Sequence, residues 1–204
     1  MRVLFLSLMW ACGKSEIDNK KAAQVTEVKS TEVVEKKSTE APAKDTPKAA
    51  GWSLDPSSKV EWVGAKVTKD HPGGFKKVTG SAQVEGQELK QITADIEIAS
   101  LFSDHPKLTK HLLNEDFFEV AKFATASFKS TEISKDNIKG VLDLHGIQKE
   151  LSFPATISIS EKSVGIKSEF TINRRLWGIN YNGRANDLIK DDVLIKLDVL
   201  YKSN

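Results

Sequence analysis

Apolar and polar residues alternate with period two along most of residues 59–202, and this pattern constrains the fold more than any other feature of the sequence. Residues 92–98 read Ile-Thr-Ala-Asp-Ile-Glu-Ile. Such alternation is typical of a β-strand with one buried face. Comparable runs predict about eight strands, at 59–67, 73–86, 92–100, 123–133, 137–146, 150–160, 164–172 and 192–202.

Short turn signals separate these runs. Pro, Gly, Asn and Asp cluster at 71–74, 85–86, 135–137, 145–146 and 182–183. Connections this short leave no room for crossover helices, so we expect a mainly antiparallel sheet. A closed eight-stranded barrel with an apolar interior and a two-layer sandwich would both hide the apolar face, and the alternation does not distinguish between them.

Residues 103–118 depart from the alternation. Leu108 and Leu112 stand at helical spacing, and Pro106 suits the first turn of a helix. Ser103 or Asp104 can cap its start. We therefore expect a short helix at 106–113, followed by a turn, that plugs one end of a barrel. Its leucines, with Phe117 and Phe118, are either a plug alone or also part of a cavity mouth.

The segment before residue 52 is different in kind. Residues 13–51 contain no aromatic residue and are rich in Lys, Glu, Thr, Ala, Ser and Pro. A stretch of this composition buries too little apolar surface to offset the entropy lost on ordering. We expect residues 12–51 to be a disordered N-terminal tether and residues 52–204 to be one folded domain.

The first residues read as a targeting segment. Arg2 precedes the apolar run Val3–Trp10, which is too short to span a bilayer as a mature helix. Ala11 and Cys12, the sole cysteine, resemble the cleavage box of a bacterial lipoprotein. We predict a signal segment at 1–11, lipidation of Cys12, and export across the inner membrane to a periplasmic or outer-membrane-anchored location. The alternatives are an ordinary secretory signal and a free cysteine.

The sequence argues against several classes of function. Residues 52–204 carry 21 Lys or Arg and 21 Asp or Glu, so this part is formally neutral and no nucleic-acid partner is expected. No Gly-x-Ser-x-Gly elbow, nucleotide-binding glycine loop or metal-ligand spacing of histidines occurs. We predict no catalytic residues, no metal and no cofactor, and keep an unrecognised hydrolase only as a third hypothesis.

Four segments, in order, resemble the YceI-like family of secreted, lipocalin-like barrels. The first is WSLDPSSKVEW at 52–62 and the second is His111-Leu112 with EDFFEV at 115–120. The third is IKGVLDLHGIQKELSFP at 138–154, and the fourth is FTINRRLWGI at 170–179. The resemblance covers 52–204 and implies an extended eight-stranded antiparallel barrel. It also implies an interior that holds an isoprenoid-like or fatty-acyl amphiphile, in a protein that is often a homodimer.

The candidate ligand-binding residues follow from the inward faces of the runs and from the predicted helix. Arg174 and Trp177 have two interpretations: a structural cation–π pair at the barrel rim, or a site for the ligand's head group. We expect an extracytoplasmic lipid carrier; the alternative is a structural or protein-interaction barrel with a filled core. The apolar candidates are Trp62, Ile96, Ile98, Leu112, Phe117, Phe128, Leu142, Phe153, Ile157, Phe170 and Ile195.

Overall fold

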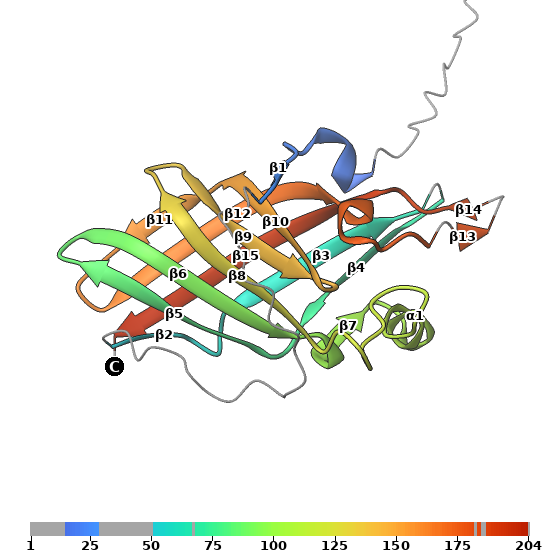
Figure 1. Cartoon of the computed structure of the whole chain (residues 1–204), viewed down its shortest axis with the longest axis horizontal. Helices are drawn as coiled ribbons and strands as arrows, with labels where there is room; N and C mark the ends of the chain where they lie inside the picture. Colours follow the sequence, from blue (N-terminus) through green and yellow to red (C-terminus); the bar gives the residue numbers. More distant parts are fainter. Residues whose placement is uncertain (1–14, 29–50, 67, 182, 185–186, 204) are drawn as a thin grey trace, which may run out of the picture.

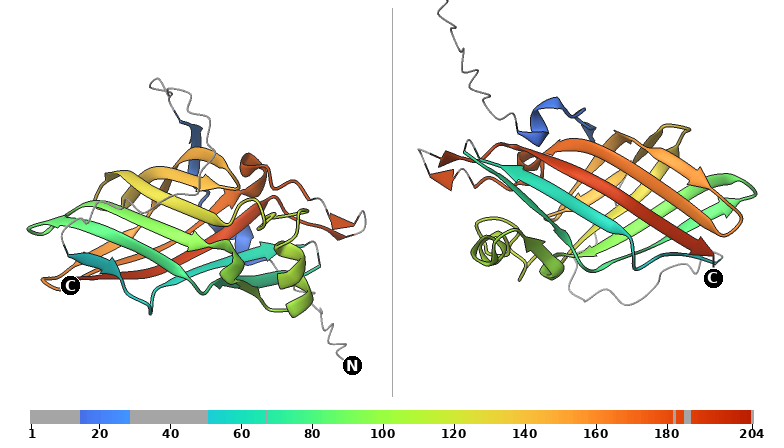
Figure 2. Two further views of the ribbon diagram at one scale, coloured as in Figure 1. Left: turned by 60° about the horizontal axis from the view of Figure 1, so that its bottom comes forward. Right: turned by 180° about the vertical axis from the view of Figure 1, so that it is seen from behind.

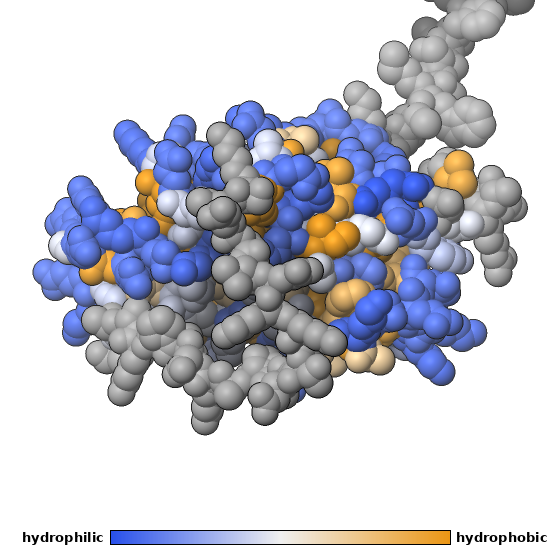
Figure 3. Space-filling model, in the orientation of Figure 1, coloured by the Kyte–Doolittle hydropathy of each residue, from blue (hydrophilic) through white to orange (hydrophobic). Residues whose placement is uncertain are grey.

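The computed structural model of the protein describes residues 15–28, 51–66, 68–181, 183–184 and 187–203. These residues form a long, twisted antiparallel sheet that curls around an apolar interior, with one α-helix at one end of the molecule (Figures 1 and 2). The expected all-β class with one short helix is confirmed. Figure 3 shows that hydrophilic side chains cover most of the described part of one face.

The elements are as follows. The helices are η1 (Glu16–Asn19), η2 (Ile98–Ser100), α1 (Pro106–Leu112) and η3 (Arg174–Trp177). The strands are β1 (Gln24–Glu27), β2 (Trp52–Leu54), β3 (Lys59–Ala65), β4 (Asp70–Phe75), β5 (Val78–Glu85), β6 (Glu88–Glu97), β7 (Leu101–Ser103), β8 (Thr125–Ile133), β9 (Asn137–Leu144), β10 (Ile147–Pro154), β11 (Thr156–Ile159), β12 (Ser163–Asn173), β13 (Gly183–Arg184), β14 (Asp187–Leu188) and β15 (Asp192–Ser203).

The main sheet has thirteen strands and is not closed, so the prediction of a closed eight-stranded barrel was wrong in both respects. Its order is β1-β10-β9-β8-β6-β5-β2-β15-β3-β4-β7, and β12 pairs with β15 and β11. The run at 147–159 shows the reason. Pro154 ends the pairing of β10 with β9, and β11 then pairs with β12. Because proline has no N–H to continue a ladder, the strand changes partner there.

The segment His71-Pro72-Gly73-Gly74, expected to be a turn, lies inside strand β4 and pairs with β3. The two glycines allow close approach of neighbouring side chains. A Cβ on Gly73 would lie 2.3 Å from a ring carbon of Trp62, and one on Gly74 would lie 2.9 Å from the Phe102 ring. The expected turn at His145-Gly146 is present, and both residues have the positive φ angles of a two-residue hairpin, 55° and 72°.

The N-terminal segment is ordered where the structure describes it, which corrects the expectation of a disordered tether for residues 15–28. Strand β1 pairs antiparallel with β10. Ile17 of η1 is buried against Val63 and Leu194. Composition misled the prediction because a polar segment can be ordered by pairing its backbone with unpaired strand edges. Residues 29–50 lie outside the described part of the chain.

The short helix α1 confirms the expected element, although its cap differs. The ring nitrogen Nδ1 of His105, and not Ser103 or Asp104, accepts a hydrogen bond from the Lys107 amide, at 3.2 Å. Leu112 and Phe117 then pack with Trp62 and Ile179 in a small apolar cluster at this end of the sheet. A much larger cluster of buried residues runs through the interior along the strands.

Candidate functional site

A cavity of about 250 Å³ lies inside the curled sheet. Its wall is built from alternate residues of the long strands, whose side chains point to the same inner face. Apolar side chains make up nearly all of the lining. The titratable residues among them are Lys66, His71, Arg174 and Tyr201. Such a site favours a hydrocarbon over a charged or strongly polar ligand.

Most of the predicted ligand-binding residues line this cavity. Ile157 and Trp177 do not. Ile157 lies on β11 opposite Ile166, half-buried against the main core, and Trp177 is fully buried in η3. Those that line the cavity are Trp62, Ile96, Ile98, Leu112, Phe117, Phe128, Leu142, Phe153, Phe170, Arg174 and Ile195.

Three phenylalanines form an aromatic group in the wall. The rings of Phe153 and Phe170 are stacked, with centroids 4.4 Å apart and an interplanar angle of 16°. Phe128 tilts against Phe153 at 5.7 Å. The Phe128 ring lies over Gly140, where a Cβ would be only 2.5 Å from its Cζ. Gly140 therefore makes space for the Phe128 ring.

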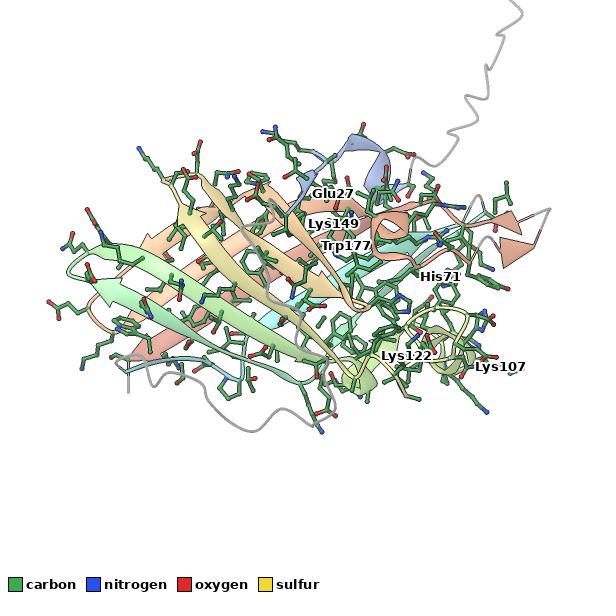
Figure 4. All side chains as sticks on the ribbon, in the orientation of Figure 1. Glu27, His71, Lys107, Lys122, Lys149 and Trp177 are labelled. Carbon is green, nitrogen blue, oxygen red and sulfur yellow. The ribbon has the colours of Figure 1, made fainter. Side chains whose placement is uncertain are left out.

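The charged residues of the lining mark one end of the cavity. His71 lies on β4 at the α1 end of the molecule, the same end as Lys107 and Lys122 (Figure 4). Its Nδ1 is 3.0 Å from Oδ1 of Asp104. The pKa of Asp104 is lowered. Burial is the largest single influence and would raise this pKa, but the hydrogen bonds from His71 and Lys69, together with their charges, outweigh it. His71 therefore gives the α1 end of the cavity a polar side chain.

Tyr201 of strand β15 also lines the cavity. It is almost fully buried, its hydroxyl donates to the carbonyl of Thr93 at 3.0 Å, and burial raises its pKa. The period-two alternation of 193–201 already placed Tyr201 on the inner face, although it was not among the predicted ligand residues. Ile179 and Ile189 were missed because they lie in connections that carry no alternation.

Arg174 has a structural role in the described molecule. It is 4% exposed, and its guanidinium donates to the carbonyls of Ile179 (2.6 Å) and Lys190 (3.3 Å) and to Oδ1 of Asp191 (3.1 Å). The desolvation lowers its pKa. Its neighbour Arg175 is more exposed and reaches the same Asp191 oxygen. Of the two arginines only Arg174 is buried, and its nitrogens bind protein groups.

Trp177 does not form a cation–π pair with Arg174. The cation–π pairs among the described residues are Lys76 over Phe102 and Lys122 over Phe123. Its indole Nε1 instead donates to the carbonyl of Leu142, at 3.4 Å. The Nδ1 of His145 lies 3.2 Å from the Trp177 carbonyl. Trp177 thus fastens η3 to the β9–β10 hairpin, outside the cavity.

Within residues 15–28, 51–66, 68–181, 183–184 and 187–203, no group of three or more His, Cys, Asp or Glu side chains could hold a metal ion. No helix in this described part of the chain is long and apolar enough to cross a membrane.

The chain is similar to a known family of protein domains. The YceI-like domain matches residues 52–201. A UPF0312 protein of Pseudomonas fluorescens (strain SBW25) is 31% identical over 170 residues, which cover 72% of this chain and 86% of that protein. A UPF0312 protein of Pseudomonas putida F1 is 29% identical with the same coverage.

Solved structures share the fold at lower identity. Burkholderia cenocepacia BcnA superposes with a TM-score of 0.65 at 19% identity, covering 72% of this chain and 98% of that one. A polyisoprenoid binding domain from Saccharophagus degradans, implicated in plant cell wall breakdown, gives 0.64 at 15% identity, covering 76% and 99%. The domain match over residues 52–201 and the 31% identity to the Pseudomonas fluorescens protein both lead to one conclusion. This chain belongs to the YceI-like family.

Proposed function

We propose that this protein binds the apolar chain of an isoprenoid-like or fatty-acyl amphiphile in its internal cavity and acts as an extracytoplasmic carrier. The observation that supports it is the apolar lining of a 250 Å³ space inside the curled sheet. Ligand pockets typically measure about 300–1,000 Å³, so this one suits a single slender chain. The head group would remain near His71, at the α1 end.

The fold supports the same proposal. The solved polyisoprenoid binding domain has this architecture over most of both chains. The alternative of a structural barrel with a filled core is disfavoured by the cavity, because well-packed interiors leave few voids larger than a water molecule.

Native mass spectrometry of protein purified from its host tests the proposal. A co-purifying lipid with repeated five-carbon mass increments, or a fatty acid, would support the carrier function. Titration with farnesol and with a fatty acid, followed by thermal unfolding, gives the equilibrium test. If no lipid co-purifies and neither compound raises the melting temperature, the proposal fails.

We also propose that the protein is exported and anchored through a lipidated Cys12, as a periplasmic or outer-membrane lipoprotein. Cys12 lies outside the described residues, and the proposal depends on the sequence around it. Growth with radiolabelled palmitate tests it. The full chain should be labelled and a Cys12→Ala variant should not, whereas equal labelling of both would contradict lipidation at Cys12.

The family resemblance also suggests a homodimer. Sedimentation of the purified protein should show twice the monomer mass of 22.5 kDa if the signal segment is retained. A monomer at micromolar concentration would remove this part of the proposal.

A further inference from the structure

The N-terminal segment of residues 15–27, called the strap below, lies outside the residues that match the YceI-like domain. It lies between β10 and β12 and is hydrogen-bonded to both (Figure 1). On one side, β1 pairs with β10 from Gln24–Ser152 to Glu27–Lys149. On the other, the Ala23 amide donates to the Thr171 carbonyl at 2.9 Å, and the Thr171 amide donates to the Lys21 carbonyl at 3.1 Å.

The strands on either side of the strap both contribute to the cavity. Leu151 and Phe153 of β10 and Phe170 and Ile172 of β12 all line it. Val25 pairs with Leu151, so the two side chains project to the same, inner face. Val25 and Ala23 pack against the main core cluster. The strap therefore covers the sheet between β10 and β12, beside residues that line the cavity, although none of its own residues is among the lining.

The strap is attached mainly by polar contacts near the surface. Ser15 donates to both carboxylate oxygens of Asp70, at 2.8 and 2.9 Å. Ion pairs join it to the sheet, among them Lys20–Glu169 and Glu27–Lys149, the latter visible in Figure 4. Exposed pairs of this kind each contribute little. Ile17 is the one side chain of the strap that is buried.

A segment with these attachments can open without unfolding the rest of the sheet. Regions with few buried apolar contacts are the ones that open locally at low free energy. The strands beside it are long and paired on their far sides, β10 with β9 and β12 with β15. Release of the strap would leave β10 and β12 in place and expose the cavity between them.

We propose that the strap is a lateral gate of the ligand site: lifting it opens a portal between β10 and β12 through which the apolar chain enters, and redocking it seals the wall. This inference rests on the proposed lipid-binding function. It assigns a role in ligand exchange to a segment that the domain shared by the family does not include.

A reversible disulfide across the strap tests the gate. Thr26 and Glu150 are paired in the ladder, with Thr26 Oγ1 donating to Glu150 Oε1 at 3.1 Å, and they lie on the outer face, away from the cavity. Their Cα atoms are at the cross-strand spacing that a disulfide spans. The full chain would carry Thr26→Cys and Glu150→Cys together with Cys12→Ser. The matched control is Lys167→Cys with Asp198→Cys, an exposed pair that joins β12 to β15.

The measurement is the rate at which cis-parinaric acid, a fluorescent fatty acid, enters the cavity. Oxidation of the strap lock should slow association and dissociation by about tenfold or more, as a closed lid does, and dithiothreitol should restore both rates. The affinity should change little. The control disulfide should leave the rates unchanged. Ile17→Asp, which alters the outer face only, should accelerate uptake.

The outcomes separate the gate from the function it serves. If oxidised and reduced strap variants take up the probe equally fast, the lateral gate is wrong and entry lies elsewhere, for example at the α1 end. If the wild-type chain binds neither cis-parinaric acid nor farnesol, the proposed lipid binding fails, and the gate fails with it.

Discussion

Nη1 of Arg174 donates a 2.6 Å hydrogen bond to the carbonyl of Ile179, and this contact joins the end of strand β12 to the connection that follows it. The same guanidinium donates hydrogen bonds to the Lys190 carbonyl and the Asp191 carboxylate, which lie at the other end of that connection. Ile179 and Ile189 line the cavity, so Arg174 shapes the site through the backbone it holds.

Arg174→Lys should therefore destabilise the protein more than Arg175→Lys. A lysine has one nitrogen and cannot match the fork of a buried guanidinium, so two acceptors lose their partner. We expect a loss of about 2–3 kcal/mol in the free energy of unfolding, measured by urea denaturation. Arg175→Lys, on the exposed side, should lose less than about 1 kcal/mol. Equal losses would show that burial of the Arg174 fork is unimportant.

Gly73→Ala should be markedly destabilising, because its Cβ would lie 2.3 Å from both the Trp62 ring and the Phe102 carbonyl. Overpacking of this kind usually costs about 1–3 kcal/mol. Gly64→Ala is the matched control, since its Cβ would meet the same Trp62 ring at an ordinary 3.7 Å. Thermal unfolding compares the two. A Gly64 variant as unstable as the Gly73 variant would contradict the close-approach explanation.

Ala126→Leu should reduce lipid binding while the protein stays folded. Ala126 is 2% exposed and lines the cavity, so three added carbons would occupy space needed by the ligand. We expect affinity for cis-parinaric acid to fall about tenfold or more, equivalent to at least about 1.4 kcal/mol.

Ala121→Leu, at an exposed position outside the cavity, is the control for Ala126→Leu. Circular dichroism verifies that both variants fold. Unchanged affinity in a folded Ala126 variant would place the ligand elsewhere.

The strap should detach more often as the pH falls below the ordinary pKa range of a glutamate side chain. A hydrogen bond from Lys20 lowers the pKa of Glu169, with Lys196 contributing. When docking lowers the pKa of a carboxylate, the ionised carboxylate stabilises the docked state at pH values above its unfolded-state pKa of about 4.3. This stabilisation is lost as the pH falls through the lowered folded-state pKa. Hydrogen exchange of residues 15–27, corrected for its intrinsic pH dependence, should rise over that window.

Glu169→Gln should remove this part of the pH response. Glu88→Gln is the control, because the pKa of Glu88 is also lowered by a lysine, Lys90, on a strand that does not touch the strap. If the wild-type strap exchanges equally at pH 3 and pH 6, the Lys20–Glu169 pair does not hold it.

Much of the architecture was predictable from local pattern. Ile92, Ile96 and Phe128 alternate with polar residues in short runs, and alternation in a strand fixes which face is buried whatever the partner strand is. The sequence therefore determined the strand class, the antiparallel pairing, the helix at Pro106–Leu112 and most of the cavity wall. It also carried the motifs of the YceI-like family.

Only the tertiary structure decided how these strands meet. Pro154 shifts the chain from one partner to another, and the β10–β12 gap that results is filled by residues whose polar composition predicts no structure. The ladder contacts of Ala23 and Val25 join strands that lie more than a hundred residues away along the chain. The local sequence pattern specifies which face of a strand is apolar. Backbone hydrogen bonds at the edge of a strand, in contrast, can be made by almost any residue. Which segment fills a gap in the sheet therefore depends on the assembled fold.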